Sequence, residues 1–259
     1  MAFSIDAAAW GSPWRRIAVA DKALLVTGTL VLDLLVPAWP GTLLVAAGLT
    51  IAAIASARVD WRLWLAALAL PLTFVLTGVL SIALQVGPPA PGSTPWWSWG
   101  PLAVTAESVA RAGTVLGRSL AGTCAVVLLA VSTPMVDLVD AGRRLGVPAP
   151  AMDIAALMYR LLFVLWESAV TIRSAQAARL GYVGLRRSVR SFGSLAAGVL
   201  VSAWDRSRRL EQGLSGRGYT DDLRTLRHVR PHSPVFLAAT GAWLLALAAI
   251  GTYGSGVLG

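Results

Sequence analysis

The sequence predicts an all-α integral membrane protein with about five transmembrane helices, six being the alternative count, and a cytoplasmic segment of long helices. Of the 259 residues, 56% are hydrophobic and only 14% are charged, whereas soluble domains contain about 25% charged residues. The mean hydropathy is +0.67. Apolar runs of about 20 residues, the length that crosses a bilayer as a helix, recur along the chain.

Three candidate spans lie in the first third of the chain. The first covers about residues 17–36 and ends at Pro37, and the second covers about 42–55. A short charged loop at 58–62 precedes the third span, which covers about 63–86. A membrane-spanning helix needs roughly 17 to 25 mainly apolar residues, so we interpret these runs as spans joined by short turns.

An uncharged segment at 87–101 follows the third span and is rich in Pro, Gly, Ser and Trp. Because indole rings favour the headgroup level of a bilayer, we interpret it as a non-cytoplasmic loop that rests on the membrane interface. The next helix begins within 102–118 and continues through the apolar stretch 119–131 to end near Pro134. Near its start, Glu107 and Arg111 are spaced i,i+4 and can pair on a helix.

A last span covers about residues 235–253, and five crossings are the simplest total. Residues 143–230 contain 15 arginines and six acidic residues, while the rest of the chain has seven basic and seven acidic residues. Basic loops remain in the cytoplasm. This rule places the arginine-rich segment, the N-terminus and the 58–62 loop inside the cell, the Trp-rich loop outside, and the C-terminus outside.

We therefore expect three regions along the chain. Residues 1–133 form an N-terminal transmembrane region with about four spans, residues 134–232 form a cytoplasmic segment, and residues 233–259 form a C-terminal transmembrane helix. This division follows from the apolar runs together with the position of the arginines.

The cytoplasmic segment contains two stretches that are typical of helices but make poor spans. In 152–179, polar residues recur every seven positions among bulky apolar ones, which predicts a long helix with a wide apolar face. A second helix begins at Ser194, with an apolar half followed by a charged half. Such helices must pack on each other, on the membrane face or on a partner.

The two stretches end alike. The first ends in Ala178-Arg179-Leu180-Gly181-Tyr182 and the second in Ser215-Gly216-Arg217-Gly218-Tyr219. A glycine after the last turn stops a helix, and an arginine there suits the negative end of the helix dipole, so capping alone can explain either end. Its repetition 38 residues later, with the same residue types, points to a shared role.

Several catalytic classes are excluded by residue counts. Cys124 is the only cysteine and Lys22 the only lysine, so the chain has no internal disulfide, no thiolate metal cage and no P-loop of its own. We therefore expect no cofactor and no catalytic residue in this chain.

His228 and His232 invite a metal-site interpretation, which we do not adopt. The pair has no third nitrogen or sulfur ligand nearby, Pro231 interrupts the helical spacing, and the surrounding arginines repel cations. We therefore predict no metal ligands. Asp33 is a further candidate, because a carboxylate inside a span is a functional hypothesis by default; it lies within a turn of Pro37 and can reach the interface.

The order of several short motifs resembles the transmembrane (T) component of energy-coupling factor (ECF) transporters, and most closely its cobalt-type CbiQ branch. The motifs are Ile5-Asp6, Ser12-Pro13-Trp14-Arg15-Arg16, Arg118-Ser119-Leu120, Thr133-Pro134, Leu145-Gly146-Val147-Pro148, Tyr159-Arg160, Glu167-Ser168-Ala169-Val170, Arg173-Ser174-Ala175-Gln176, Arg179-Leu180-Gly181-Tyr182, Gly216-Arg217-Gly218-Tyr219 and Leu223-Arg224. Each is weak alone, and their shared order and spacing carry the resemblance.

The resemblance implies a division of labour. A T component spans the membrane and places two coupling helices on a pair of cytoplasmic ABC-type ATPases, which hydrolyse the ATP, while a separate membrane subunit captures the substrate. Each coupling helix ends in an x-Arg-x motif. Carried over here, the motifs are Ala178-Arg179-Leu180 and Gly216-Arg217-Gly218. The first departs from the family's alanine-arginine-glycine form at Leu180.

Two alternatives remain open. One is a T component that serves nickel or a vitamin, because the arginine motifs are shared across the transporter group. The other is an integral-membrane enzyme that acts on lipid substrates. Such enzymes present clustered acids or histidines at the membrane face, and only Asp137-x-x-Asp140 and Asp221-Asp222 come close.

Overall fold

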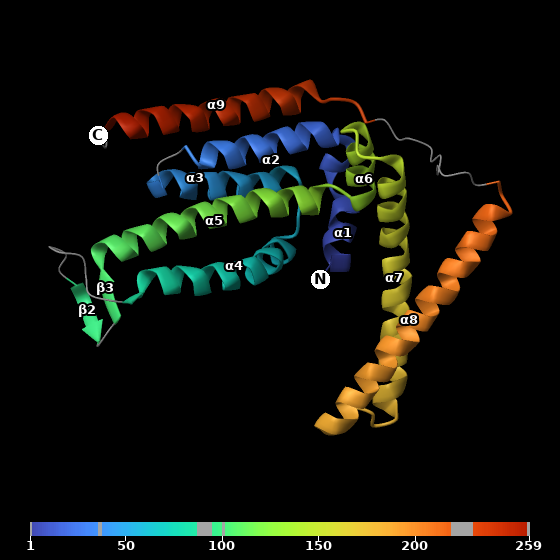
Figure 1. Ribbon diagram of the computed structural model, residues 1–259. Coiled ribbons are helices and arrows are strands. Elements are labelled where there is room, and N and C mark those ends of the chain that lie inside the picture. Colours follow the sequence, from blue (N-terminus) through green and yellow to red (C-terminus); the bar gives the residue numbers. More distant parts are fainter. Residues whose placement is uncertain (1, 36–37, 87–94, 100–101, 219–229, 258–259) are drawn as a thin grey trace. The chain divides into compact units, whose positions relative to one another are not determined.

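The computed structural model describes residues 2–35, 38–86, 95–99, 102–218 and 230–257 (Figure 1). The elements in chain order are α1 (Ala2–Gly11), the 3-10 helix η1 (Pro13–Arg16), α2 (Val19–Asp33), α3 (Ala38–Ile51), the π-helix η2 (Ala52–Ser56), α4 (Trp61–Ala83), β1 (Gln85–Val86), β2 (Pro95–Trp99), β3 (Leu102–Thr105), α5 (Ala106–Ser132), α6 (Met135–Arg144), α7 (Ala149–Ala178), α8 (Leu185–Ser215) and α9 (Pro234–Val257). They form two compact units, Met1–Pro134 with Val229–Gly259, and Met135–His228.

The predicted all-α membrane fold is confirmed. Among the described residues, four helices are long and apolar enough to cross a membrane, namely α4, α5, α7 and the Pro234–Thr252 part of α9. The second predicted span corresponds to a shorter apolar helix, Gly41–Ser56. The length and composition of α7 would allow a crossing, whereas the arginine distribution predicts a cytoplasmic segment.

The first predicted span is shorter than expected. In place of residues 17–36, α2 has 15 residues, a length of about 22 Å against a hydrocarbon core of roughly 30 Å. A side chain from α5 caps its C-terminal end: Nη2 of Arg118 donates to the carbonyl of Leu34 at 3.3 Å. The last carbonyls of a helix need such external donors, and an arginine in the middle of α5 supplies one here.

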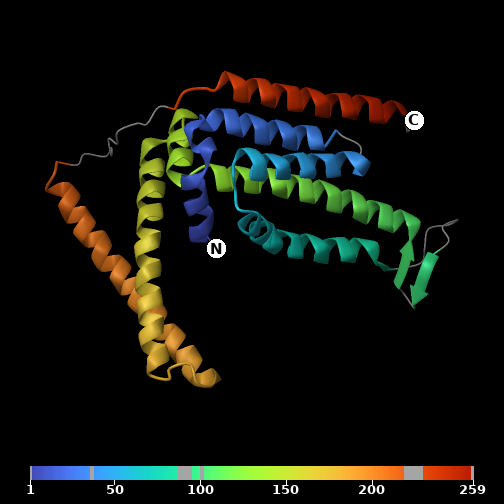
Figure 2. The ribbon, with the colours of Figure 1, turned by 180° about the vertical axis from the view of Figure 1, so that it is seen from behind.

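The first unit is built around α5. Its buried side chains Cys124, Leu128 and Val131 belong to one apolar cluster that also contains Leu49 of α3 and Trp64 of α4. All five side chains are at most 2% exposed. Figures 1 and 2, which view the molecule from opposite sides, both show α2, α3 and α5 side by side, with α4 along one side of α5 and α9 along α2.

The Trp-rich segment contains a small sheet that the sequence did not predict. Strand β3 pairs antiparallel with both β1 and β2, in the order β1-β3-β2. Trp96 and Trp97 lie on β2 and are 70% and 50% exposed, as suits indole rings at a membrane interface. Residues 87–94 and 100–101 of the predicted loop lie outside the described part of the chain.

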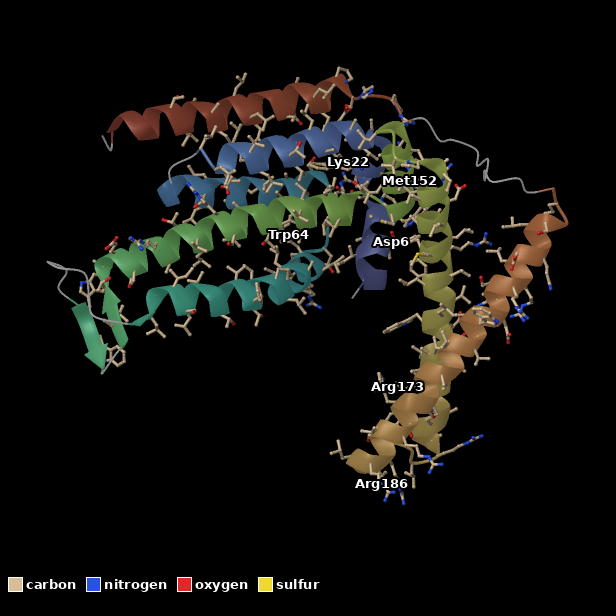
Figure 3. All side chains as sticks on the ribbon, in the orientation of Figure 1. Asp6, Lys22, Trp64, Met152, Arg173 and Arg186 are labelled. Carbon is tan, nitrogen blue, oxygen red and sulfur yellow. The ribbon has the colours of Figure 1, made fainter. Side chains whose placement is uncertain are left out.

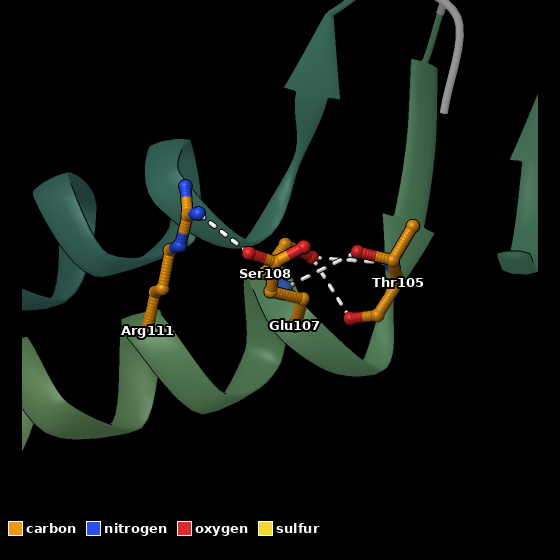
Figure 4. A network of polar contacts seen from close by, with 4 residues as sticks. All are labelled: Thr105, Glu107, Ser108 and Arg111. Carbon is orange, nitrogen blue, oxygen red and sulfur yellow. Dashed lines mark hydrogen bonds and ion pairs between the residues drawn. The ribbon is translucent and has the colours of Figure 1, made fainter. Parts of the chain in front are cut away.

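A capping box sets the start of α5, which the sequence left uncertain within 102–118 (Figure 4). The backbone N–H of Ser108 donates to Oγ1 of Thr105 at 3.2 Å, and the N–H of Thr105 donates back to Oγ of Ser108 at 3.1 Å. Reciprocal bonds of this kind satisfy two free donors at a helix N-terminus. The predicted pair of Glu107 and Arg111 is present at 2.5 Å.

Two consecutive residues of α2, Asp21 and Lys22, bind the segments through which the chain leaves and re-enters the first unit. Nζ of Lys22 donates to the carbonyl of Ser132, the last residue of α5, at 3.1 Å. Asp21 accepts from the backbone N–H of Ser233 at 3.2 Å and lies 2.6 Å from Nδ1 of His232. Both α2 side chains are at most 3% exposed (Lys22 is labelled in Figure 3). Because a buried polar group is costly without partners, these bonds hold both connections firmly.

The packing of α3 against α9 leaves no space for a side chain at Gly48. A Cβ at this position would lie 2.2 Å from the indole ring of Trp243, and overpacking of this kind costs about 1–3 kcal/mol. We expect Gly48→Ala to lower the apparent free energy of unfolding in an SDS titration by that amount. Gly78 of α4 has open space around its Cβ position, so Gly78→Ala should leave stability unchanged or raise it by up to about 1 kcal/mol. Equal effects of the two substitutions would contradict this packing.

Candidate interaction site on the α7–α8 pair

The second unit begins with an elbow between α6 and α7. The guanidinium of Arg143 on α6 forms an ion pair with Asp153 on α7, and their side chains are 13% and 3% exposed. Between the two helices, Gly146 adopts φ +87°, a conformation that only glycine adopts readily. Removing one partner of a buried ion pair is strongly destabilising, so this pair fixes the direction in which α7 leaves α6.

Both long helices carry uncovered apolar side chains. On α7 these side chains repeat every four residues, and on α8 they lie in two groups, at 185–192 and at 200–204. They are Ile154, Met158, Leu162, Trp166 and Val170 on α7, and Leu185, Val189, Phe192, Leu200, Val201 and Trp204 on α8, each at least 50% exposed. Along α8, all of whose residues are described, none is buried. The two helices therefore do not enclose a core of their own, and their apolar rows have the character of an interaction surface.

The turn between α7 and α8 is held by the side chain of Gln176. Its Nε2 donates to the carbonyl of Ser191 at 3.0 Å and to Oγ of Ser194 at 2.8 Å. Its Oε1 accepts from the hydroxyl of Tyr182 at 2.7 Å. The hydroxyl of Ser191 in turn donates to the carbonyl of Gly181 at 2.8 Å. These bonds join the last turn of α7 to the first three turns of α8, so the connection is well defined.

The first arginine motif lies at this turn. Arg179 directly follows α7 and its side chain is exposed. Leu180 has φ +57° and is 64% exposed, and the N–H of Gly181 donates to the carbonyl of Gln176 at 2.9 Å. A Cβ at Gly181 would lie 2.7 Å from Oγ of Ser191 and 2.9 Å from that carbonyl. The glycine is therefore required, whereas Leu180 occupies a left-handed position that normally favours glycine.

The second motif lies directly after α8. The N–H of Arg217 donates to the carbonyl of Leu214 at 3.0 Å, and the N–H of Gly218 donates to Ser215 at 3.1 Å. Gly218 has φ +72°, and Arg217 is exposed. Each arginine thus follows the last turn of a helix and is exposed.

The second helix starts earlier than predicted, at Leu185 in place of Ser194. Gly184, with φ +83°, ends the turn, and the arginines and serines that follow continue the helix, since arginine is a good helix former. Because α8 therefore has 31 residues, its two ends are separated by about 45 Å. The structure does not bring Arg179 and Arg217 together: it places them at opposite ends of α8.

The histidines and the carboxylate considered as metal ligands do not form a metal site in the described part of the chain. His232 pairs with Asp21 of α2 at 2.6 Å, and His228 lies outside the described residues. Asp33 is 4% exposed, and its Oδ1 has no hydrogen-bond partner in the described part of the chain. Within that part, no group of three or more His, Cys, Asp or Glu side chains could hold a metal ion.

The family model described as cobalt transport protein, CbiQ, matches residues 11–228, most of the chain. The chain belongs to the CbiQ family. A CbiQ cobalt transport protein of Rhodobacter capsulatus is 38% identical over 234 residues, which cover 90% of this chain and 91% of that protein. As a family member with several apolar membrane-length helices, the chain is a multi-pass membrane protein of a transport system.

Two further relatives have other names. A putative fused cobalt transport protein, CbiMQ, of Methanocorpusculum labreanum is 29% identical over 219 residues, or 83% of this chain and 36% of that protein. The ECF transporter transmembrane protein EcfT of Limosilactobacillus fermentum is 29% identical over 171 residues, or 61% of this chain and 62% of that protein. The CbiQ family chain therefore shares sequence with the transmembrane component of ECF transporters.

The residues that shape the CbiQ site were only partly visible in the sequence. The repeated context of the motif arginines makes them recognisable in the sequence. The role of Gln176 is not recognisable there, because it depends on Ser191 and Ser194 of the next helix. The ion pair of Arg143 with Asp153 was not anticipated, although the two residues are only ten positions apart.

Substitutions at Leu180 test the conformation of the first turn. A left-handed non-glycine residue costs about 1–2 kcal/mol, so Leu180→Gly should leave the turn as stable as before or up to about 1 kcal/mol more stable. Leu180→Val places a β-branched residue at the same φ and should destabilise the turn by about 1–2 kcal/mol. Hydrogen exchange of amides 176–184 in detergent measures both effects. Wild-type exchange rates in Leu180→Val would contradict the assigned conformation.

Proposed function

We propose that the chain is the membrane-spanning T subunit of an ATP-driven cobalt importer of the ECF type. Its membership of the CbiQ cobalt transport family and its similarity to EcfT support this proposal. The apolar helices of the first unit provide the membrane scaffold. The ATP is hydrolysed by separate cytoplasmic ATPase subunits, and the ion is captured by a separate membrane subunit. The relative named as a putative fused cobalt transport protein, CbiMQ, supports a close partner of that kind.

The observation that carries the proposal is the placement of Arg179 and Arg217. Both are exposed, both follow the last turn of a long helix, and α8 separates them by its whole length. A guanidinium offers five donors in a planar fork, which suits carboxylates and the carbonyls at helix ends. We call the helix end that carries Arg179 the first tip and the end that carries Arg217 the second tip. The two tips are about 45 Å apart, and each can engage one subunit of an ATPase pair.

The mechanism we propose is mechanical. ATP binding draws the two ATPases together, which displaces the two tips relative to each other. Because Gln176 bonds α7 to α8 and Arg143 bonds α6 to α7, the displacement moves whole helices and does not dissipate in the turns. The apolar rows on these helices then act on the substrate-capturing membrane subunit. Transmission of this kind requires packed helices with two discrete arrangements.

The topology we propose keeps residues 134–232 and the N-terminus in the cytoplasm and the C-terminus outside. Although α7 is long and apolar enough to cross a bilayer, a crossing would carry the arginine-rich N-terminal half of α8 to the outer side, against the positive-inside rule. A cytoplasmic α7 also leaves its apolar row available to a partner.

Paired arginine substitutions test the proposal. We expect Arg179→Ala/Arg217→Ala to insert normally in the membrane but to lose at least about 90% of the ATPase that co-purifies with wild type, because central interface arginines contribute strongly to binding. Arg62→Ala/Arg111→Ala, which removes two exposed arginines of the first unit, serves as the matched control and should retain the ATPase. Retention by both variants would contradict the assigned contact.

Uptake measurements test which ion is transported. With the ATPases and the capturing subunit present, cells that express the chain should accumulate radiolabelled cobalt, and the double arginine variant should reduce uptake to background. Preferential uptake of nickel, or of a vitamin, would preserve the coupling role and contradict the assignment to cobalt.

A further inference from the structure

The two tips of the α7–α8 pair carry unequal charge. Residues 178–191, which form the first tip, contain four arginines and no acidic residue. The arginines are Arg179, Arg186, Arg187 and Arg190, all exposed. Residues 205–218, which form the second tip, contain four arginines and the acidic residues Asp205 and Glu211. Over equal lengths of 14 residues, the first tip therefore has a net charge of +4 and the second of +2.

We propose that the first tip is the principal, salt-dependent attachment to the ATPases, through an acidic protein surface that meets Arg186, Arg187 and Arg190. The inference rests on the proposed function and adds that the two ATPase contacts differ in strength and in salt dependence. The second tip, with Arg217 as its main cation, is the weaker attachment and depends little on salt.

The first turns of α8 are electrostatically unfavourable without a partner. Three arginines lie at the positive end of the helix dipole, no acidic residue is in the first turn, and the cap residue Gly184 forms no side-chain bond. Arg186 and Arg190 are also spaced i,i+4, where like charges repel. No hydrogen bond or ion pair joins these side chains to another described residue. An acidic surface would remove this repulsion, which is why the observations favour an anionic partner here.

The turn between α7 and α8 holds the arginine cluster, Arg186, Arg187 and Arg190, beside Arg179. The Ser191 hydroxyl bonds to the Gly181 carbonyl, and Gln176 reaches the Ser191 carbonyl across the turn. Figure 3 shows Arg186 at the end where α7 and α8 meet. A partner that covers Arg179 therefore also meets the cluster, and this continuity favours the ATPase over any other acidic surface.

The far half of α8 provides a control of equal charge. Arg206, Arg208 and Arg209 are also three arginines on the same helix; Arg208 and Arg209 are exposed and Arg206 is half-buried. They lie beside Asp205 and Glu211, and the guanidinium of Arg208 lies 5.7 Å from the ring of Trp204. Replacing either trio by glutamine removes the same charge and preserves helix propensity.

The test measures ATPase binding to the full chain in lipid nanodiscs at about 0.05 and 0.3 M salt, which span the range in which screening becomes strong. Nanodiscs of neutral lipid and nanodiscs with anionic phosphatidylglycerol are compared. We expect Arg186→Gln/Arg187→Gln/Arg190→Gln to weaken binding by at least about tenfold at low salt and to remove most of the salt dependence, as charges at an interface do. Arg206→Gln/Arg208→Gln/Arg209→Gln should weaken binding by less than about threefold.

Each other result overturns the inference in a recognisable way. Equal losses in the two variants, with wild type still bound, would mean that only the overall positive charge matters; the proposed function would stand and the division between tips would fall. If the first variant binds the ATPase normally but loses a lipid-dependent effect seen in anionic nanodiscs, the cluster serves a lipid surface. If wild type binds no ATPase under any condition, the proposed function and the inference fail together.

Discussion

Asp21 and Lys22 hold both of the connections that link the two units. Lys22 bonds the carbonyl that ends α5, after which the chain leaves the first unit, and Asp21 bonds His232 and Ser233, where the chain returns. Neither side chain can be removed from its partners without exposing a buried polar group to an apolar core. Both ends of the first unit's chain at this junction are therefore bonded to the start of α2.

The second unit combines turns that are fixed by polar contacts with long helix faces that are not covered. Its turns are fixed by polar contacts, the Gln176 network at one end of α7 and the Arg143–Asp153 pair at the other, while its long faces are left uncovered. A soluble domain would bury these apolar rows, since their exposure is costly in water. Rigid turns combined with open faces suit a coupling element, which must keep its shape and still exchange contacts with partners.

Local signals in the sequence predicted much of this architecture. The apolar runs and the arginine-rich segment identified an all-α membrane protein, and the spacing of Glu107 and Arg111 predicted an ion pair that is present. What could not be predicted depends on residues distant in sequence. No residue near Leu34 indicates that Arg118 caps the end of α2, and the pair of Asp21 with His232 joins positions 211 residues apart. The early start of α8 was missed because only the apolar residues that begin at Ser194 were used to place it, whereas arginine also continues a helix well.

The central claim is that one chain engages two ATPase subunits, one at each end of α8. A photo-crosslinking amino acid placed at Leu180 and at Ser215 together, both exposed beside the motif arginines, tests it most directly in the purified complex. The account predicts a covalent product that contains one chain and two ATPase subunits, and a product with one ATPase subunit from either site alone. A doubly substituted chain that captures only one ATPase subunit, or none, would contradict it.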